Sequence, residues 1–377
     1  MPSQTSIAPV IRLGNSPWMR LRVMVVLAAL AASVFGYPAV AGSPSGQLSI
    51  DWVSVGDPGN APDNEVMLSD RTSGYGAVPY WYQIGKYDVT NVQYAGFLNA
   101  VASESDPHLL FDPCMDSAQC YGLGSGVARS GSAGSYSYAV EAGRERRPIN
   151  YVNMYDAMRF ANWMNNGQGT GDTETGAYTL RGGTPVPTNA FAIRRNAGAK
   201  VFLPSENEWY KAAYYDPDKH SYYNYPAGTD TPMKCGLPGP TPNTANCESV
   251  TGAANPANPG VPDGGWIYNY LTDVGAYTNS ASPSGAFDMG GDVYQWTDDL
   301  TYTVTDQYSI GSHITPVLDT LGTIVGSPYT TGVGVCGILR GVDFGDSGEY
   351  NASNGRSCDY AVDKFETYGI RLARIPA

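Results

Sequence analysis

Hydrophobic and polar residues alternate in two stretches of the N-terminal quarter of the chain. In residues 47–55, Leu48, Ile50 and Trp52 fall on one side of an extended backbone, and residues 78–89 are rich in aromatic and β-branched side chains. A period of two and this enrichment are typical of β-strands. We therefore predict one strand over residues 47–55 and another over residues 78–89.

The period then changes to that of a helix. Thr90 and Gln93 have the spacing of a capping box, in which each side chain bonds the backbone N–H of the other residue. Four apolar residues follow at helical spacing: Tyr94, Phe97, Leu98 and Val101. This pattern predicts a short amphipathic helix that begins after Thr90.

Two further helices have the same kind of signature. One begins near Asn153 with Asp156 in its first turn and ends at residues 165–167, which read Asn-Asn-Gly. Its apolar stripe consists of Ala157, Phe160, Ala161 and Met164. The other begins with the capping box of Ser205 and Glu208, and its buried face consists of Trp209, Ala212 and Ala213.

The remaining chain is mostly irregular. Residues 103–147 and 216–273 are dominated by small, polar and turn-forming residues, and the first of these stretches indicates a surface insertion. Three C-terminal segments read as short strands between turns: residues 285–296, 337–344 and 368–373. No internal repeat is present, so we predict one compact α+β domain with few short helices and short antiparallel strands.

The N-terminus has the features of a secretory signal. Arg12, Arg20 and Arg22 precede an apolar run over residues 23–36, and Ala39-Val40-Ala41 offers small residues for cleavage. The run is shorter than the roughly 20 residues that span a bilayer. We predict a signal peptide over residues 1–41 and a mature domain over residues 42–377, with no stable membrane span after cleavage. A retained N-terminal anchor is the alternative.

Charge and cysteine content agree with an exported protein. The net charge is −13 with only 22 Lys and Arg, which argues against nucleic-acid binding and suits a cation-binding protein. Six cysteines in an exported chain indicate disulfides, although six allow 15 connectivities. Proximity along the chain favours Cys114–Cys120, Cys235–Cys247 and Cys336–Cys358. A dithiol metal site is the competing interpretation, but the chain contains no C-x-x-C motif.

Six segments in a fixed order resemble the formylglycine-generating enzyme family, also called the sulfatase-modifying factor domain family. They are residues 87–99 (YDVTN, QY and FLN), Arg147–Ile149 with Tyr155–Ala157, Phe202–Trp209, Phe287–Trp296, Leu339–Gly341 and Gly369–Ala373. Together they extend over most of residues 50–375. The resemblance implies a single loop-rich domain with a C-type-lectin-like fold.

The resemblance also implies bound calcium. One family site corresponds here to Asp288, Gly291, Val293 and Gln295, in which Gly291 and Val293 would contribute backbone carbonyls. The family usually has Glu where Gln295 stands, so one formal charge is lost. A tight turn with capping side chains is the alternative. A second site begins near Asn246 and Cys247, with Asp263 as a loose further candidate.

The family's oxidative chemistry lacks its ligands in this chain. The enzyme holds copper with two cysteines, and the ungapped register from Arg340 places Asp346 and Asn351 at those positions. Copper(I) prefers soft thiolates, which a carboxylate and an amide do not replace. We therefore predict no catalytic residue, and we expect neither copper nor iron. Whether the chain is an enzyme stays open, with the balance against it.

Other catalytic centres have little support. Relatives that use non-haem iron take histidines from a helical partner domain, whereas His108, His220 and His313 here occur in loop-like contexts. A metal centre rebuilt from scattered loops is an open alternative. No G-x-S-x-G elbow precedes a helix, and no phosphate-binding glycine motif follows a strand.

A binding surface is the remaining hypothesis. Residues 343–367 mix rigid aromatic and adaptable polar side chains, which suits ligand recognition. By resemblance this segment lies where the enzyme holds its substrate peptide, and relatives in diversity-generating retroelements vary it. The candidate binding residues are Phe344, Asp346, Tyr350, Asn351, Arg356 and Tyr360.

The sequence thus predicts a secreted, periplasmic or cell-envelope protein, stabilised by calcium, that binds a peptide, protein or glycan. The alternatives are an oxidoreductase with a rebuilt metal centre and a structural protein of the cell envelope.

Overall fold

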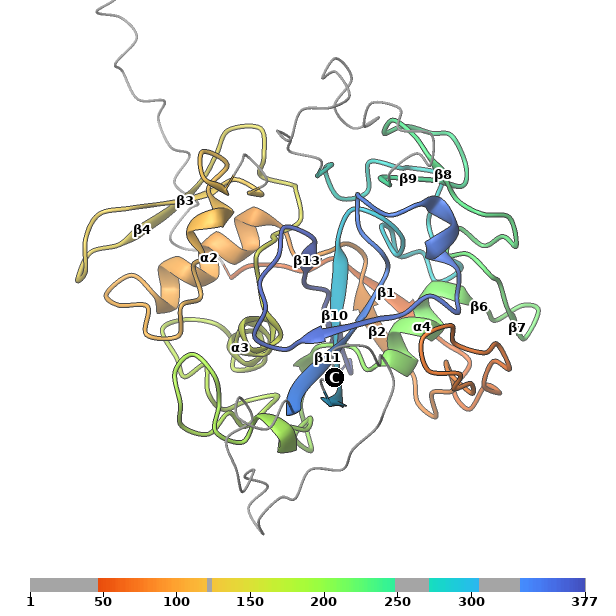
Figure 1. Cartoon of the computed structure of the whole chain (residues 1–377), viewed down its shortest axis with the longest axis horizontal. Helices are drawn as coiled ribbons and strands as arrows, with labels where there is room; N and C mark the ends of the chain where they lie inside the picture. The colour runs from red at the N-terminus through yellow and green to blue at the C-terminus, as the bar shows by residue number, and fades with distance from the viewer. Residues whose placement is uncertain (1–46, 121–123, 248–270, 305–332, 377) are drawn as a thin grey trace, which may run out of the picture. The chain divides into compact units, whose positions relative to one another are not determined.

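Two four-stranded sheets organise the chain. A computed structural model describes residues 47–120, 124–247, 271–304 and 333–376. The first sheet has the order β1 (Trp52–Val55), β2 (Tyr82–Gly85), β14 (Ala373–Arg374) and β5 (Val201–Phe202), all antiparallel. Strands from the two ends of the described chain thus lie in one sheet. Figure 1 shows β1 and β2 side by side.

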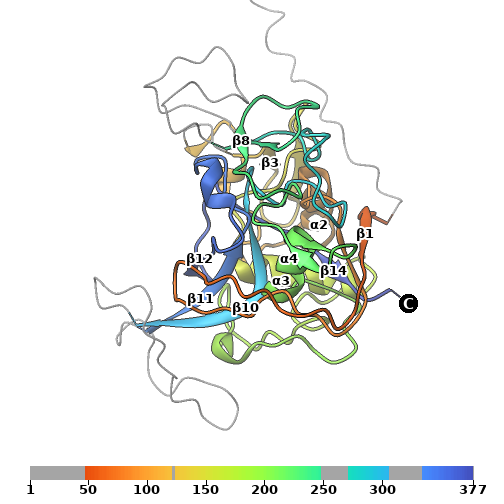
Figure 2. The same ribbon diagram turned by 90° about the vertical axis from the view of Figure 1, so that its right-hand side faces the viewer.

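The second sheet has the order β12 (Ser357–Tyr360), β11 (Val333–Arg340), β10 (Tyr294–Val304) and β13 (Tyr368–Gly369). Its two long strands, β10 and β11, run antiparallel side by side (Figure 2), with an irregularity in register between Trp296 and Leu300. The β13 strand pairs with β10 in parallel. Together, the two sheets and the few helices form the predicted mixed α+β, C-type-lectin-like architecture.

The three predicted helices are confirmed. They are α2 (Asn91–Val101), α3 (Met154–Asn165) and α4 (Glu206–Tyr214). The Thr90 backbone N–H donates to Gln93 Oε1 over 2.8 Å, and the Ser205 N–H donates to Glu208 Oε2 over 2.6 Å. Each helix therefore begins where its capping box satisfies backbone donors that the helix itself leaves unpaired. Among the described residues, none of the helices has the length and apolarity needed to traverse a bilayer.

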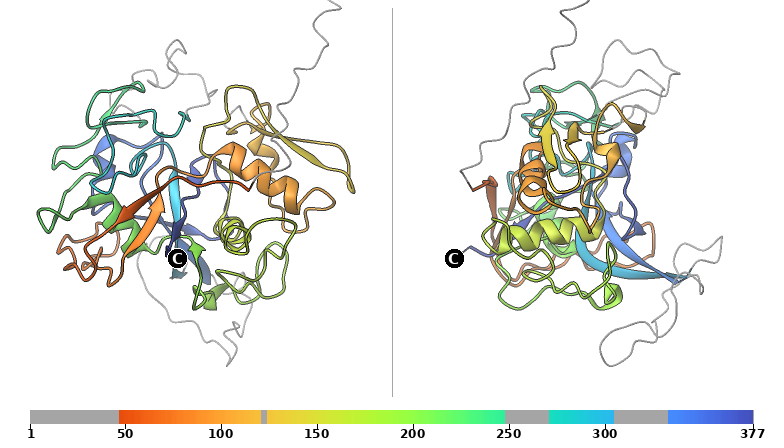
Figure 3. Two further views of the ribbon diagram at one scale, coloured as in Figure 1. Left: turned by 180° about the vertical axis from the view of Figure 1, so that it is seen from behind. Right: turned by 90° about the vertical axis from the view of Figure 1, so that its left-hand side faces the viewer.

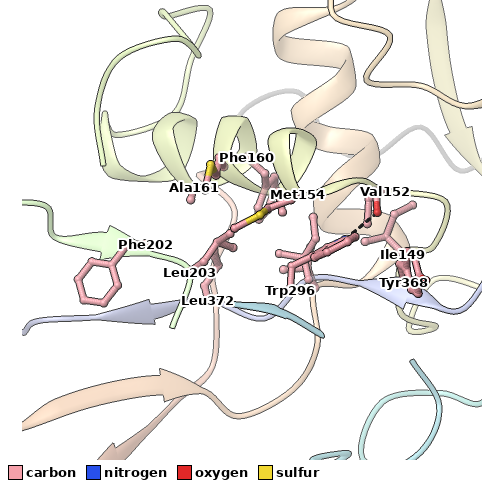
Figure 4. Close-up of a cluster of buried hydrophobic side chains, with 14 of the residues drawn as sticks. Ile149, Val152, Met154, Phe160, Ala161, Phe202, Leu203, Trp296, Tyr368 and Leu372 are labelled. Atoms are coloured by element: carbon pink, nitrogen blue, oxygen red, sulfur yellow. Dashed lines mark hydrogen bonds between the residues drawn. The ribbon is translucent and has the colours of Figure 1, made fainter. Parts of the chain in front are cut away.

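The main hydrophobic core lies between α3 and the strands (Figure 4). Trp296 of β10 is fully buried, and its indole N–H donates to the Val152 carbonyl over 2.9 Å just before α3. Met154 on α3 points toward Leu203 and Leu372 (Figure 4), and Ala373, the neighbour of Leu372, opens β14. Phe160 packs instead on Tyr94 and Phe97 of α2. Burial of these large side chains fixes α3 against both sheets.

The three predicted disulfides are confirmed as Cys114–Cys120, Cys235–Cys247 and Cys336–Cys358. No cysteine is free. Disulfides of this number are characteristic of extracellular or periplasmic proteins, because the cytosol keeps thiols reduced.

The predicted surface insertion contains a hairpin that packs on α2. Its strands are β3 (Val127–Ser130) and β4 (Ser137–Val140), which follow the short 3₁₀ helix η2 (Pro113–Met115). The Asn99 side chain on α2 donates to the Tyr138 carbonyl over 2.7 Å and accepts from its N–H over 2.9 Å. Figure 3 shows the hairpin beside this helix.

Where the structure describes it, the stretch predicted as irregular between α4 and residue 273 contains only short paired segments. They are β6 (Tyr215–Asp216) with β7 (Ser221–Tyr222), and β8 (Lys234–Cys235) with β9 (Thr244–Ala245). Two further 3₁₀ helices, η4 (Ala190–Ala192) and η5 (Gly348–Asn351), complete the described elements.

The C-terminal strands differ from the prediction in their bounds. Residues 285–292 form turns, because Asp288, Gly291 and Asp292 have positive φ angles of 55°, 83° and 67° that a strand does not allow. β10 therefore begins only at Tyr294. β11 ends at Arg340, before Gly341 with a φ of 101°.

The predicted strand over residues 368–373 is two strands in different sheets. Its first two residues join the second sheet as β13, and Ala373 joins the first sheet as β14. Between them, the carbonyls of Ile370 and Leu372 accept from the N–H groups of Val89 and Gly85. The segment thus connects the two sheets, and its apolar sequence reflects burial on both sides. β12 was not predicted.

Candidate functional site

A buried arginine fixes the start of the candidate binding segment. Arg340, at the end of β11, has no exposed surface, and its guanidinium bonds Glu206 Oε1 on α4 over 2.6 and 2.9 Å. The same guanidinium donates to the carbonyls of Ser353 and Gly355 over 2.9 and 2.6 Å. The loop over residues 341–356 is therefore tied to α4 by charge-assisted hydrogen bonds.

The two positions that correspond to the family's copper cysteines have different environments. Asp346 is partly exposed, and its Oδ2 accepts a hydrogen bond of 2.8 Å from the Tyr294 hydroxyl. Asn351 is 2% exposed, lies against Gly290, and its side-chain amide has no hydrogen-bond partner in the described part of the chain. Neither residue supplies a thiolate, and every cysteine is in a disulfide.

The structure separates the six candidate binding residues into exposed and buried groups. Tyr350 and Tyr360 are 60% and 37% exposed, and Asp346 is half-buried. Phe344 is buried with Leu271 and Val293. As placed, only the exposed group has side-chain surface that a ligand could reach.

The predicted binding residue Arg356 has partners within the protein. Its side chain is 11% exposed and forms ion pairs with Asp70 and with Glu206, the latter over 2.9 Å. Arg356 therefore joins the loop before β2 to α4, and both of its partners are carboxylates. Its role in binding a ligand stays a prediction.

Sequence reasoning did not single out the aromatic group that includes Tyr294, whose hydroxyl bonds Asp346. Tyr294 and Tyr368 lie with ring centroids 6.4 Å apart, and Phe365 packs edge-on against Tyr368 at 5.3 Å. The Tyr368 hydroxyl donates to Asp359. In the sequence, aromatic and acidic residues recur near one another over residues 343–368. The sequence-based prediction considered the two types separately and therefore did not group them.

One carboxyl group in this region has a strongly shifted pKa. Burial raises the pKa of Asp343 to about 7, and the nearby charge of Asp346 adds to the effect. Backbone N–H groups of Gly345 and Asp346 oppose it, and Glu366 adds further repulsion. Asp343, Asp346 and Glu366 thus lie close enough for their charges to repel one another.

The predicted calcium ligand Gln295 is fully engaged with protein groups. Its Oε1 accepts from Trp209 Nε1 over 2.6 Å and from Arg371 Nε over 2.7 Å. Its Nε2 donates to the Asp288 carbonyl over 2.7 Å. Both lone pairs of this oxygen are used. In this arrangement Gln295 does not offer calcium a ligand.

Three of the other predicted calcium ligands line a small pocket. Asp288 and Gly291 line it together with Asn246 from the second predicted site. Asp292, which was not predicted, also lines the pocket, and its Oδ1 accepts from Asn246 Nδ2 over 2.8 Å and from the Thr272 N–H over 3.0 Å. The two predicted sites thus meet at one place.

Two buried carboxyl groups at this pocket have raised pKa values. Burial raises the pKa of Asp288 to about 6, and burial followed by the charge of Asp288 raises that of Asp292 to about 7. A divalent cation would remove this repulsion, and carboxylate and carbonyl oxygens are its preferred ligands.

The three other positions predicted to bind calcium are Cys247, Val293 and Asp263. Cys247 is in its disulfide, and the Val293 side chain is buried in an apolar cluster, which leaves only backbone carbonyls as donors to calcium. Asp263 lies outside the described residues.

The two histidines that the structure describes have different surroundings. His108 lies 3.6 Å from a Glu174 oxygen, whereas His220 is exposed and 3.0 Å from Asp57. His313 lies outside the described residues. Among those described, no three His, Cys, Asp or Glu side chains form a group that could hold a metal ion.

Comparison with known proteins identifies the family. The sulfatase-modifying factor enzyme 1-like domain family matches residues 74–376. The chain belongs to this family. The match includes every described strand except β1, the three described helices and the candidate binding segment.

Two solved structures are similar to this chain at low sequence identity. CarF has a TM-score of 0.50 at 16% identity and covers 88% of this chain and 100% of its own. Treponema denticola variable protein 1 has a TM-score of 0.45 at 16% identity and covers 89% of this chain and 98% of its own. At this identity, the likeness to CarF establishes the family fold alone.

One curated relative is similar over a short region. Hercynine oxygenase of Mycobacterium tuberculosis is 37% identical over 101 residues, which are 27% of this chain and 17% of the oxygenase. The chain therefore spans less than a fifth of that protein's length.

Proposed function

We propose that this family member is an exported, non-catalytic protein that binds a ligand through the surface of residues 343–367. One observation carries the proposal: the positions that hold copper in the enzyme are Asp346 and Asn351, and all six cysteines are paired in disulfides. The chain therefore has no free thiols with which to bind copper.

The geometry of the segment supports binding. Arg340 holds the loop rigidly over α4, and the exposed aromatic rings of Tyr350 and Tyr360 come from different elements, η5 and β12. Rigid aromatic side chains on a fixed framework lose little conformational entropy when a ligand binds. The buried neighbours Phe344 and Asn351 position this surface and do not form it.

Export is part of the same proposal. The disulfides need an oxidising compartment, and the N-terminal 41 residues have the charge and hydrophobic pattern of a signal. N-terminal sequencing of the protein purified from the culture medium or periplasm should begin at Gly42. A cytoplasmic product with reduced thiols would contradict this part.

We propose calcium at the pocket of Asp288, Gly291, Asn246 and Asp292. In support, two buried carboxyl groups there repel each other. Calcium should raise the melting temperature, because a ligand that binds only the folded state stabilises it by mass action. An unchanged midpoint in excess chelator, or the same calcium shift in Asp288→Asn as in the wild type, would remove this claim.

The binding proposal itself is tested with arrays of immobilised peptides, glycans and secreted proteins. The wild type should retain a defined subset that the double variant Tyr350→Ser/Tyr360→Ser loses. Val92→Ser, at an exposed apolar position on α2, is the matched control and should bind like the wild type. Equal binding by all three proteins would place the ligand elsewhere, and self-assembly without any ligand would favour a structural role.

A further inference from the structure

The outer face of the first sheet, which is the side opposite buried Tyr82, carries two solvent-accessible tryptophans. Trp81 is 44% exposed and Trp52 is half-buried, whereas the other tryptophans that the structure describes are at most 3% exposed. Trp52 lies opposite Gly85, and Trp81 precedes β2 in the same alternation, so both side chains are on this face. Figure 2 shows β1 toward the right-hand margin of the described chain, with α3 and α4 toward its interior.

A row of polar side chains crosses the same face between the two tryptophans. Ser54, Gln83 and Arg374 lie opposite one another on β1, β2 and β14. Arg374 Nε donates to Gln83 Oε1 over 2.7 Å, and Gln83 Nε2 donates to Ser54 Oγ over 3.3 Å. The guanidinium carbon of Arg374 lies 4.6 Å from the centroid of the Trp52 ring. These contacts fix the row and one ring before any ligand binds, which lowers the entropic cost of binding.

The charge of Arg374 has no acidic partner in the described part of the chain. Its Nε bonds the neutral Gln83, and its two terminal nitrogens form no hydrogen bond or ion pair with a described residue. Partial burial lowers the pKa of Arg374, which is the direction expected for a cation without a nearby carboxylate. The guanidinium therefore keeps two donors that can pair with a carboxylate of a ligand.

The size of the face argues against a second protein chain as its occupant. The sheet has four strands of at most four residues each. With strands about 4.8 Å apart and a rise of about 3.3 Å per residue, its face measures roughly 250 Å². Specific protein interfaces bury about 800 Å² on each partner. A linear glycan needs less area, because its sugar rings stack on aromatic rings while its hydroxyls bond polar side chains.

We propose that the outer face of the first sheet binds a linear glycan that contains uronic acid units. Sugar rings stack on Trp52 and Trp81, the polar row bonds the hydroxyls, and Arg374 pairs with a sugar carboxylate. Strand geometry places the backbones of the two tryptophans about 14 Å apart, so the ligand extends over several sugar units. This site shares no residue with the proposed binding surface of residues 343–367.

The experiment uses the full exported chain and fluorescently labelled oligomers of galacturonate, alginate and hyaluronan, each with its methyl ester as the matched neutral ligand. Fluorescence anisotropy gives Kd for the wild type, Trp81→Ala and Arg374→Gln. One control is Leu237→Ala, at an exposed apolar position in another part of the chain. The other is Tyr350→Ser/Tyr360→Ser, on the surface of residues 343–367. Thermal melting confirms that each variant is folded.

We expect at least one acidic oligomer to bind about tenfold more tightly than its ester, because the ester lacks the carboxylate that pairs with Arg374. Arg374→Gln should bind the acid and the ester equally. Trp81→Ala should weaken the binding of both by about tenfold, because it removes an aromatic anchor. Both control variants should bind like the wild type.

Several results would overturn the inference. No binding of any acidic oligomer, or equal affinity of the wild type for acid and ester, would refute the ligand class. Unchanged binding by Trp81→Ala would remove the site from this face. Loss of binding in Tyr350→Ser/Tyr360→Ser alone would assign the glycan to the surface of residues 343–367 and support the proposed function there. Dimers in light scattering that Trp81→Ala dissociates would make a second copy of the chain the occupant.

Discussion

At the scale of single residues, Gln295 closes the turn before β10. The resemblance to the family predicts Glu at this position, and a carboxylate can accept but not donate hydrogen bonds at neutral pH. Here the amide donates to the Asp288 carbonyl and accepts from Trp209 and Arg371. The turn before β10 is therefore closed by a neutral side chain in place of a charged one.

We expect Gln295→Glu to lower the free energy of unfolding by about 1–3 kcal/mol in the presence of a chelator. The carboxylate leaves the buried Asp288 carbonyl without this donor. Urea denaturation measures the change, and Gln119→Glu at an exposed position is the control. A variant as stable as the wild type would show that Arg371 alone closes the turn.

Asp343 gives a second prediction at this scale. Its folded pKa of about 7 is above the ordinary value of 3.8, so the folded state binds the proton more tightly than the unfolded state. Its contribution to stability is present below pH 4 and is lost as the pH rises through 7.

The wild type should therefore lose stability relative to Asp343→Asn between pH 5 and pH 8, by about 2–3 kcal/mol. Denaturation of both proteins at several pH values measures the difference. Asp343 faces Asp346 and Glu366, so Asp346→Asn should reduce the effect. A stability difference that does not change with pH would contradict the shifted pKa.

At the scale of elements, helices were predictable because their signals are local. Capping boxes and apolar stripes occur within one or two turns, and they located all three described helices to within a residue or two. Strand bounds were less predictable. β10 begins late because positive φ angles at Asp288 and Asp292 depend on tertiary contacts, which the sequence pattern does not reveal.

The cap of α4 is the prediction at this scale. Ser205→Ala removes the hydroxyl that accepts from the Glu208 N–H, and this should cost about 1 kcal/mol of unfolding free energy. Ser105→Ala at an exposed loop position is the control and should change little. A negligible cost at Ser205 would mean that Glu208, through its bonds to Arg195, fixes the helix start alone.

At the scale of the whole molecule, the family and the disulfides could be predicted, whereas the division of the site residues could not. Six ordered segments identified a fold, because a fold constrains many separated positions at once. Burial of Phe344, Asn351 and Arg356 depends on contacts with residues far away in sequence, such as Leu271, Gly290 and Asp70. Composition alone could not distinguish those residues from the exposed Tyr350 and Tyr360.

Oxygen consumption by the purified chain tests the central claim most directly. The protein is supplied with copper(I), or with iron(II) in a parallel reaction, together with a cysteine-containing peptide and a thiol reductant. The proposed function predicts a rate equal to that of the metal in buffer and no formylglycine in the peptide by mass spectrometry. Conversion of the peptide cysteine to formylglycine, at a rate that rises in proportion to the metal bound by the protein, would contradict it. That result would establish an oxidoreductase with a rebuilt metal centre.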